Sequence, residues 1–343
     1  MPLLNRIKNR LTRHLLVPAK KSLDAAKYAL EGEKKFRAKY FADVPVDLGA
    51  IDEYRSERFP NAGPMAWLDR PDWHAELTRR HTSGQLTNEQ AAICRQWAVD
   101  GYFILKNPFA PGYLDSVWAA YEREIKAGTV KLEPEPGGPN DPHPGRFLNP
   151  HLKVPEMKSL LYSPEIVRWV GLIFGREVAP FQTIASHKGS QQLEHSDSIH
   201  MTTYPLGFMA AAWIAFEDIH RDSGPLLYYP GSHRWPYYFA RHVGIEPGEF
   251  KARGYISYGE KYEPFMQERV KEMGGKPHFF TAQKGDVLFW HANLVHGGSK
   301  RNELVHTRKA MVGHYFAAGA VCYHDMAGVL ADDRHGSNPY AKV

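Results

Sequence analysis

Beyond residue 180 the sequence consists of short apolar runs separated by glycine and proline, and this pattern constrains the fold more than any other feature. Such runs are typical of β-strands, because glycine and proline favour turns between them. Helical patterns do not alternate regularly with the runs, which disfavours a parallel α/β sheet and favours a sandwich or a jelly roll. The predicted strands are residues 181–187, 209–219, 226–229, 278–281, 287–290 and 309–316.

A helix is predicted from Thr87 to Asp100, upstream of these strands. Thr87 and Gln90 have the spacing of a capping box, in which the two side chains bond each other's backbone N–H groups. Gly101 is placed to end the helix, because glycine readily adopts the left-handed conformation that follows a last helical turn. A strand at residues 102–105 and a second helix at residues 112–126 are expected next.

The first 40 residues differ in charge from the rest of the chain. They contain 11 lysines and arginines against 3 acidic residues, so this arm carries +8 while the whole chain carries +5. Leucine and isoleucine recur every three or four positions from residue 3 to residue 15, which predicts a basic amphipathic helix. Such a helix either binds an anionic membrane surface through residues 1–20 or packs on the body as a terminal helix. The remaining 303 residues sum to −3, which argues against a nucleic-acid-binding body.

The chain is expected to be organised as a basic arm (1–40), a covering segment of short helices and loops (41–86) and one β-rich domain (87–343). Cys94 and Cys322 form no paired motif, and the longest apolar run, residues 206–216, is too short to cross a bilayer. A secretory signal is not recognisable at the N-terminus. We therefore expect a cytoplasmic protein, located at the inner face of a membrane if the arm binds one.

Two histidines and a carboxylate are the strongest candidates for chemistry. His195 and Asp197 flank one residue, and extended backbone places such a pair on the same side of the chain. His296 follows the predicted strand 287–290 and precedes two glycines. This set of side chains leaves positions open on Fe(II) for small molecules and oxygen. Arg308 lies 12 residues after His296 and offers a planar guanidinium that binds carboxylates bidentately.

With these motifs in this order, the chain resembles the phytanoyl-CoA dioxygenase-like branch of the Fe(II)/2-oxoglutarate oxygenases. The resemblance extends over residues 87–317 and includes Asp100–Leu105, which look like the first strand of that family. The matching segments are residues 192–198, 213–219, 223–226, 230–233, 284–291 and 296–298, followed by Arg308 and residues 314–315.

The resemblance implies a mainly β fold with flanking helices, built on a double-stranded β-helix of the jelly-roll, cupin-like type. It implies that His195, Asp197 and His296 bind Fe(II), that Arg308 binds the distal carboxylate of the cosubstrate 2-oxoglutarate, and that O2 is consumed. Gln192 either reaches the cosubstrate or pairs within its strand. Because Asp197 is present, the implied reaction is hydroxylation of an unactivated C–H bond, with release of succinate and CO2, rather than halogenation.

The alternative is a metal-binding β-barrel without oxygenase activity that acts as a peripheral membrane or scaffold protein. Other residues also compete for roles in the site. Arg301 is the rival of Arg308, and Trp213 and Trp290 are expected to be core aromatics rather than substrate platforms. Ser232 and His233 are expected to be turn residues. Further histidines that could be proposed as ligands are His200, His220, His291, His306 and His314.

Substrate selection is expected from two segments outside the motifs. Residues 133–150 contain five prolines before Arg146, so they form a loop rather than a helix, and long loops are often lids. Residues 241–277 are rich in tyrosine, which suits a ligand with polar and apolar parts. We therefore expect a small-molecule substrate, and the basic arm favours a lipid-linked one.

Overall fold

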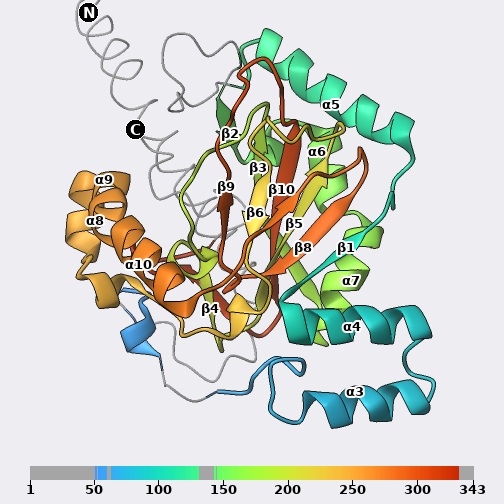
Figure 1. Ribbon diagram of the computed structural model, residues 1–343, viewed down its shortest axis with the longest axis vertical. Coiled ribbons are helices and arrows are strands. Elements are labelled where there is room, and N and C mark those ends of the chain that lie inside the picture. Colours follow the sequence, from blue (N-terminus) through green and yellow to red (C-terminus); the bar gives the residue numbers. More distant parts are fainter. Residues whose placement is uncertain (1–50, 52, 60–62, 131–142, 144, 332–343) are drawn as a thin grey trace, which may run out of the picture. The chain divides into compact units, whose positions relative to one another are not determined.

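The computed structural model describes residues 51, 53–59, 63–130, 143 and 145–331 (Figure 1). The chain divides into two compact units, Met1–Pro45 and Val46–Val343, and all described residues belong to the second. The predicted amphipathic arm and most of the proline-rich loop lie outside the described residues. None of the helices in the described part is both long and apolar enough to cross a membrane.

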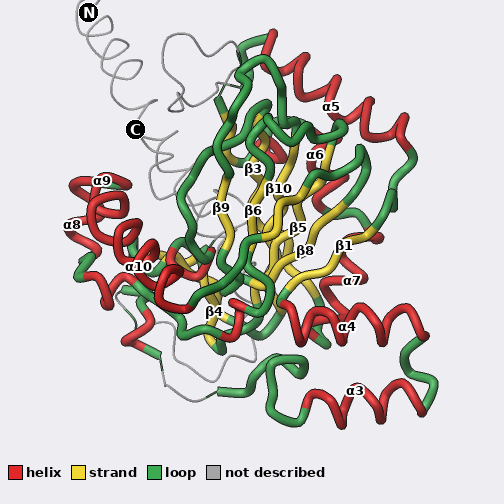
Figure 2. The backbone as a smooth tube through the Cα atoms, viewed as in Figure 1, coloured by secondary structure: helices red, strands yellow, loops and turns green. Residues whose placement is uncertain are grey.

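Helices flank the strands on both sides (Figure 2). The predicted helix near Thr87 is confirmed as α4 (Asn88–Asp100), with both bonds of the capping box present and Gly101 in the left-handed conformation at its end. The second predicted helix is α5 (Pro111–Lys126). The other α-helices are α3 (Trp73–Thr82), α6 (Pro155–Leu161), α7 (Pro164–Phe174), α8 (Pro247–Arg253), α9 (Tyr255–Ser257) and α10 (Glu263–Met273). Shorter helical turns are η3 (Ser56–Arg58), η4 (Pro150–Leu152), η5 (Asp197–Ile199), η6 (Ser232–Arg234), η7 (Ala240–Val243) and the π-helix η8 (Tyr258–Tyr262).

The strands form one large and two small antiparallel sheets. The large sheet has the order β1-β8-β5-β10-β3-β2, and the small sheets have the orders β7-β6-β9 and β12-β11-β4. Strands β1 to β6 are Tyr102–Leu105, Arg146–Leu148, Val178–Ser186, Thr202–Tyr204, Met209–Ala215 and Leu226–Tyr228. Strands β7 to β12 are His278–Phe280, Val287–His291, His296–Gly298, Ala310–Ala317, Val321–His324 and Val329–Leu330.

The sequence predicted all the longer strands and some of the short ones. Each predicted run contains a strand, with ends that shift by a few residues. Strands β2, β4, β9, β11 and β12 were not predicted; each has only two to four residues, and so short a segment shows little alternation. His296 follows the predicted strand 287–290, as expected, and it begins a further strand, β9, which was not predicted.

The large sheet separates two apolar clusters. On one face, Phe103, Phe289 and Tyr315 pack with residues of helices α4 to α7. On the other face, Trp213 and Trp290 pack with residues of the small sheet β7-β6-β9. A third cluster joins the outer side of β6 to helices α8 and α10. The mainly β fold with flanking helices is thereby confirmed, and the two facing sheets enclose the interior in which the candidate site lies.

Candidate metal centre

The backbone brings the two predicted histidine ligands directly opposite each other. The N–H of His195 donates to the carbonyl of His296 at 2.9 Å, and the N–H of His296 donates to the carbonyl of His195 at 2.8 Å. The two glycines after His296 permit this close pairing. A Cβ atom on Gly297 would lie 2.9 Å from the carbonyl oxygen of Gln192, and one on Gly298 would lie 2.6 Å from the backbone nitrogen of Gln191.

Both imidazole rings are oriented by backbone carbonyls two residues before them. Nδ1 of His195 donates to the carbonyl of Leu193 at 2.8 Å, and Nδ1 of His296 donates to the carbonyl of Leu294 at 2.9 Å. Because a carbonyl only accepts, the proton of each neutral ring lies on Nδ1. The lone pair on each Nε2 is then available to a metal, as in ligating histidines whose other nitrogen is held by a hydrogen bond.

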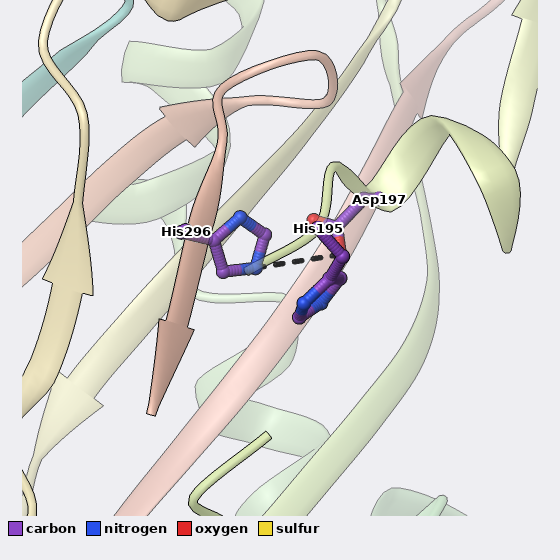
Figure 3. A group of neighbouring side chains, drawn as sticks. All are labelled: His195, Asp197 and His296. Atoms are coloured by element: carbon purple, nitrogen blue, oxygen red, sulfur yellow. Dashed lines mark ion pairs between the residues drawn. The ribbon is translucent and has the colours of Figure 1, made fainter. Parts of the chain in front are cut away.

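Asp197 completes the group at the start of η5 (Figure 3). Its Oδ1 lies 3.6 Å from Nε2 of His296, while its Oδ2 accepts a hydrogen bond of 2.7 Å from Nε1 of Trp290. Ligand atoms of Asp197, His195 and His296 all lie within 4.8 Å of one another, and all three residues are buried. No other group of three histidine, cysteine or acidic residues in the described part of the chain is arranged to hold a metal.

The electrostatics favour the protonation states that metal ligands need. Burial, reinforced by His296, lowers the pKa of His195 to about 4, so this imidazole is neutral at neutral pH. Burial alone would raise the pKa of Asp197, but electrostatic attraction to His296, His314 and His195 and the hydrogen bond from Trp290 together bring it below its usual range. The site therefore presents an ionised carboxylate beside a neutral imidazole.

A cavity of about 100 Å³ connects these three residues with the predicted cosubstrate arginine. Arg308 is 5% exposed, and its Nη1 donates to the carbonyl of Gly224 at 3.0 Å. Its guanidinium lies 5.9 Å from the ring centroid of Trp213, in the cavity wall. The other lining residues are Arg146, Ile184, Ser186, Ser190, Gln192, Leu226, Trp290, Gly297, Gly298, Ala310, Val312 and His314.

The structure separates Arg308 from its rival. Arg301 does not line the cavity, and its Nη2 donates to the carbonyl of Leu304 at 3.1 Å in the turn after β9. Gln192 does line the cavity, and its role there stays a prediction. Ser232 acts within its turn, because its hydroxyl donates to the carbonyl of Tyr229 and accepts from the N–H of Val295.

The remaining histidines lie in different places. His220 and His306 stack on each other with ring centroids 3.8 Å apart, outside the cavity. His233 and His291 line a separate cavity of about 650 Å³ that shares no lining residue with the metal cavity. His200 packs against His195 with ring centroids 5.5 Å apart.

Two contacts of the centre were missed by sequence reasoning. Trp290 is a core aromatic, as predicted, but its indole also donates to Asp197. His314 is 4% exposed, and its Nε2 lies 3.8 Å from Oδ2 of Asp197. Strand alternation places every second side chain of β8 and β10 in the interior, so it indicates that Trp290 and His314 point there. Alternation alone does not show which face of the sheet Asp197 contacts.

Comparison with known proteins gives a consistent result. Residues 97–310 match the family model for phytanoyl-CoA dioxygenase (PhyH). Peroxisomal phytanoyl-CoA dioxygenase of Homo sapiens is 26% identical over 179 residues, which are 50% of this chain and 48% of that protein. The chain thus spans about half the length of such relatives. Ectoine dioxygenase of Bordetella bronchiseptica is 25% identical over 251 residues, covering 70% of this chain and 77% of that protein.

Solved structures show a similar fold. The apo form of EctD from S. alaskensis superposes with a TM-score of 0.54 at 18% identity, covering 74% of this chain and 86% of that chain. The non-heme alpha ketoglutarate dependent epimerase SnoN from nogalamycin biosynthesis superposes with a TM-score of 0.53 at 18% identity, covering 68% and 85%. At these identities the likeness concerns the fold.

Proposed function

The chain belongs to the phytanoyl-CoA dioxygenase (PhyH) family, and we propose that it is an Fe(II)- and 2-oxoglutarate-dependent dioxygenase that hydroxylates a C–H bond of a small molecule. The observation that carries this proposal is the convergence of His195, Asp197 and His296 in one buried cavity with Arg308. Two imidazoles and one carboxylate form the facial donor set of non-heme Fe(II) oxygenases. The family and the donor set therefore support the same chemistry.

The arrangement of the sheets supports a double-stranded β-helix. Strands β8, β5, β10 and β3 lie side by side in the large sheet, and β7, β6 and β9 face them across the interior. His195 pairs with His296, so the segment before Asp197 extends the smaller sheet at β9. The proposed metal ligands then belong to adjacent backbone segments of that sheet.

The residues present fit the proposed metal and cosubstrate. His195 and His296 would bind iron through Nε2, and Asp197 would bind it through a carboxylate oxygen. Arg308 would hold the distal carboxylate of 2-oxoglutarate, because its guanidinium faces the same cavity and is steadied by Gly224. Bound iron would supply the activation of O2, coupled to decarboxylation of 2-oxoglutarate to succinate and CO2. The indole of Trp213 forms an apolar wall that limits access of water to these groups.

The cavity volume bears on where the substrate binds. About 100 Å³ leaves little room beyond the cosubstrate, so the body of the substrate would lie at the mouth. Arg146 lines that cavity and directly follows the proline-rich segment in sequence. We therefore retain residues 133–150 as the segment proposed to determine substrate specificity. Relatives named for phytanoyl-CoA and for ectoine differ too much to identify the substrate of this chain.

The direct test is cosubstrate turnover by the purified full chain. With Fe(II), ascorbate and 2-oxoglutarate, we expect slow succinate formation without added substrate, and none with His296→Ala. His306→Ala is the matched control, because this histidine lies outside the cavity. If the wild type binds metal and 2-oxoglutarate by calorimetry but forms no succinate with any of a panel of metabolites, the protein is a binding barrel and the proposed activity is wrong.

Membrane contact through residues 1–20 is a separate proposal that rests on the sequence pattern. Flotation with vesicles containing phosphatidylserine compares the full chain with a variant that lacks these residues. We expect the full chain to float and the truncated chain to stay in the dense fraction at low salt. Equal behaviour of the two would dismiss the arm as a membrane anchor.

A further inference from the structure

A single row of residues crosses the large sheet next to the metal centre. Trp290 of β8 is the direct partner of Ala211 of β5, and Ala211 is the direct partner of His314 of β10. Directly opposed residues point to the same face of a sheet. Trp290 and Ala211 belong to the apolar cluster of the interior, and Trp290 and His314 line the metal cavity. The row therefore faces Asp197.

The alanine at the centre of this row leaves a gap between two large rings. Oδ2 of Asp197 lies 2.7 Å from Nε1 of Trp290 on one side of the gap and 3.8 Å from Nε2 of His314 on the other. The carboxylate thus contacts rings on both strands that flank Ala211. Because alanine carries only one methyl group, a larger side chain at position 211 would extend toward the carboxylate.

We propose that Trp290, Ala211 and His314 form a socket that holds Oδ2 of Asp197 and leaves Oδ1 for the metal. This inference rests on the proposed function, because it concerns the ligand geometry of the same site. Oδ1 faces Nε2 of His296 at 3.6 Å, on the metal side of the carboxylate. The socket residues are positioning residues, and none of them binds the metal itself.

Trp290 makes the strongest contact in this socket. Its indole N–H bonds an ionised, buried oxygen, and such charge-assisted bonds are stronger than neutral ones. Its ring also packs on His296, with centroids 4.7 Å apart, so it contacts two of the three proposed ligands. Strands β1 and β5 pair with β8 on both sides and fix the position of the indole.

His314 contributes less. Its Nε2 is beyond hydrogen-bond distance from Oδ2, and its Nδ1 has no hydrogen-bond partner among the described residues. Packing against Phe181, with ring centroids 6.2 Å apart, restrains the ring instead. We therefore expect His314 to matter less to the socket than Trp290.

The first test removes the indole N–H and keeps an aromatic ring. Residues that orient metal ligands typically contribute about 10- to 100-fold to metal affinity, so Trp290→Phe should weaken Co(II) binding by that factor. The visible absorption of bound Co(II) should also change, which a purely structural role would not cause. Trp169→Phe is the matched control: this indole also donates to a carboxylate, that of Glu165 at 3.2 Å, but it packs among the helices. Its Co(II) affinity should equal that of the wild type.

The second test fills the gap. Ala211→Val should displace the carboxylate and weaken Co(II) binding by at least as much as Trp290→Phe, because the added methyl groups extend toward it. Ala212→Val is the control, since Ala212 is equally buried on the same strand but belongs to the cluster on the helix side. Thermal unfolding of the metal-free proteins would show whether each variant folds. If Ala211→Val does not fold, the Trp290→Phe result decides.

The outcomes separate this inference from the proposed function. A wild-type protein that binds neither Co(II) nor Fe(II) would overturn both. Suppose that the wild type binds Co(II) and His296→Ala does not. If Trp290→Phe then binds Co(II) with the affinity and absorption spectrum of the wild type, the proposed socket is wrong and the proposed function stands.

Discussion

Neighbouring residues of the same strands point to opposite faces of the large sheet and have different kinds of partner. In β8, Phe289 faces the helices and stacks on Phe103 with ring centroids 4.4 Å apart, while Trp290 faces the interior and donates to Asp197. In β10, Tyr315 packs toward the helices and His314 faces the metal cavity. One face is filled by apolar contacts, and the other face holds buried polar groups around a cavity.

This difference teaches where stability and activity are located. Apolar burial stabilises a fold roughly in proportion to area, whereas each buried polar group adds a desolvation cost that its partners offset. The helix side should therefore dominate the free energy of unfolding, and the interior side should dominate the chemistry. Substitutions at neighbouring positions of one strand provide a direct test.

The largest effect on activity is expected from Asp197→Ala. Loss of a proposed metal ligand should lower succinate formation by at least about 1000-fold, comparable with loss of an essential catalytic group. The melting temperature of the metal-free protein should fall less than for a truncation on the helix side, because the main loss is one hydrogen bond from Trp290. Coupled succinate assays and thermal unfolding would measure the two effects, and a large loss of stability would contradict the division between the faces.

The largest effect on stability is expected from Phe289→Ala. This side chain is fully buried on the helix side, and such truncations typically cost about 3–5 kcal/mol of the free energy of unfolding. Urea denaturation would measure the loss. Co(II) affinity, extrapolated to conditions in which the variant is folded, should equal that of the wild type. A lost metal site in a folded variant would show that the two faces are not independent.

A smaller effect is expected at the cosubstrate arginine. Arg308→Lys keeps the charge but loses the bidentate fork, so the KM for 2-oxoglutarate should rise about 10-fold while metal affinity is unchanged. The matched control is Arg301→Lys, which alters a similarly buried arginine outside the cavity. Steady-state kinetics at saturating Fe(II) would distinguish them, and equal KM values in both variants would remove Arg308 from its proposed role.

The sequence predicted more of the ligand set than of its surroundings. The motif around His195 and the glycines after His296 carry local signals, because spacing and close backbone pairing restrict the residue types. The contact of Trp290 with Asp197 carries no such signal, since a buried tryptophan in a strand is usually explained by packing alone. Ala211 was not singled out, because an alanine becomes informative only when the partners on both neighbouring strands are known.

Helices α6 and α7 were missed for a related reason. Both begin with proline at the first turn, at Pro155 and Pro164, where its fixed backbone angle suits a helix. In sequence the same prolines resemble breaks between loops. No helix was therefore predicted at α7, although Trp169 and Phe174 belong to the apolar cluster on the helix side of the large sheet. Short helices of this kind are stabilised mainly by packing against the sheet, and this packing cannot be seen in the local sequence.

The smallest expected effect is a dependence of stability on pH. It concerns two buried histidines, His187 near the helices and His195 in the metal centre. Burial lowers the pKa of His187, which packs against Trp118 and Tyr121, to about 4 and lowers that of His195 to about 4 as well. In the unfolded chain a histidine has a pKa near 6.5. Between about pH 6.5 and pH 4 the unfolded state therefore binds protons at these histidines that the folded state does not bind. The free energy of unfolding should therefore fall as the pH is lowered from about 6.5 to about 4, and it should be fully retained above that range.

Replacing each histidine separates the two contributions. His187→Phe and His195→Phe should each reduce the slope of stability against pH, measured by urea denaturation of the metal-free protein between pH 4 and pH 7. Saturating Co(II) should steepen the remaining slope in His187→Phe, because protons compete with the metal for the centre, and should leave the slope of His195→Phe nearly unchanged. A steeper slope in both variants would mean that the metal binds without His195. No response in either variant would mean that the environment of His187 is coupled to the metal centre, and that the two faces are not independent.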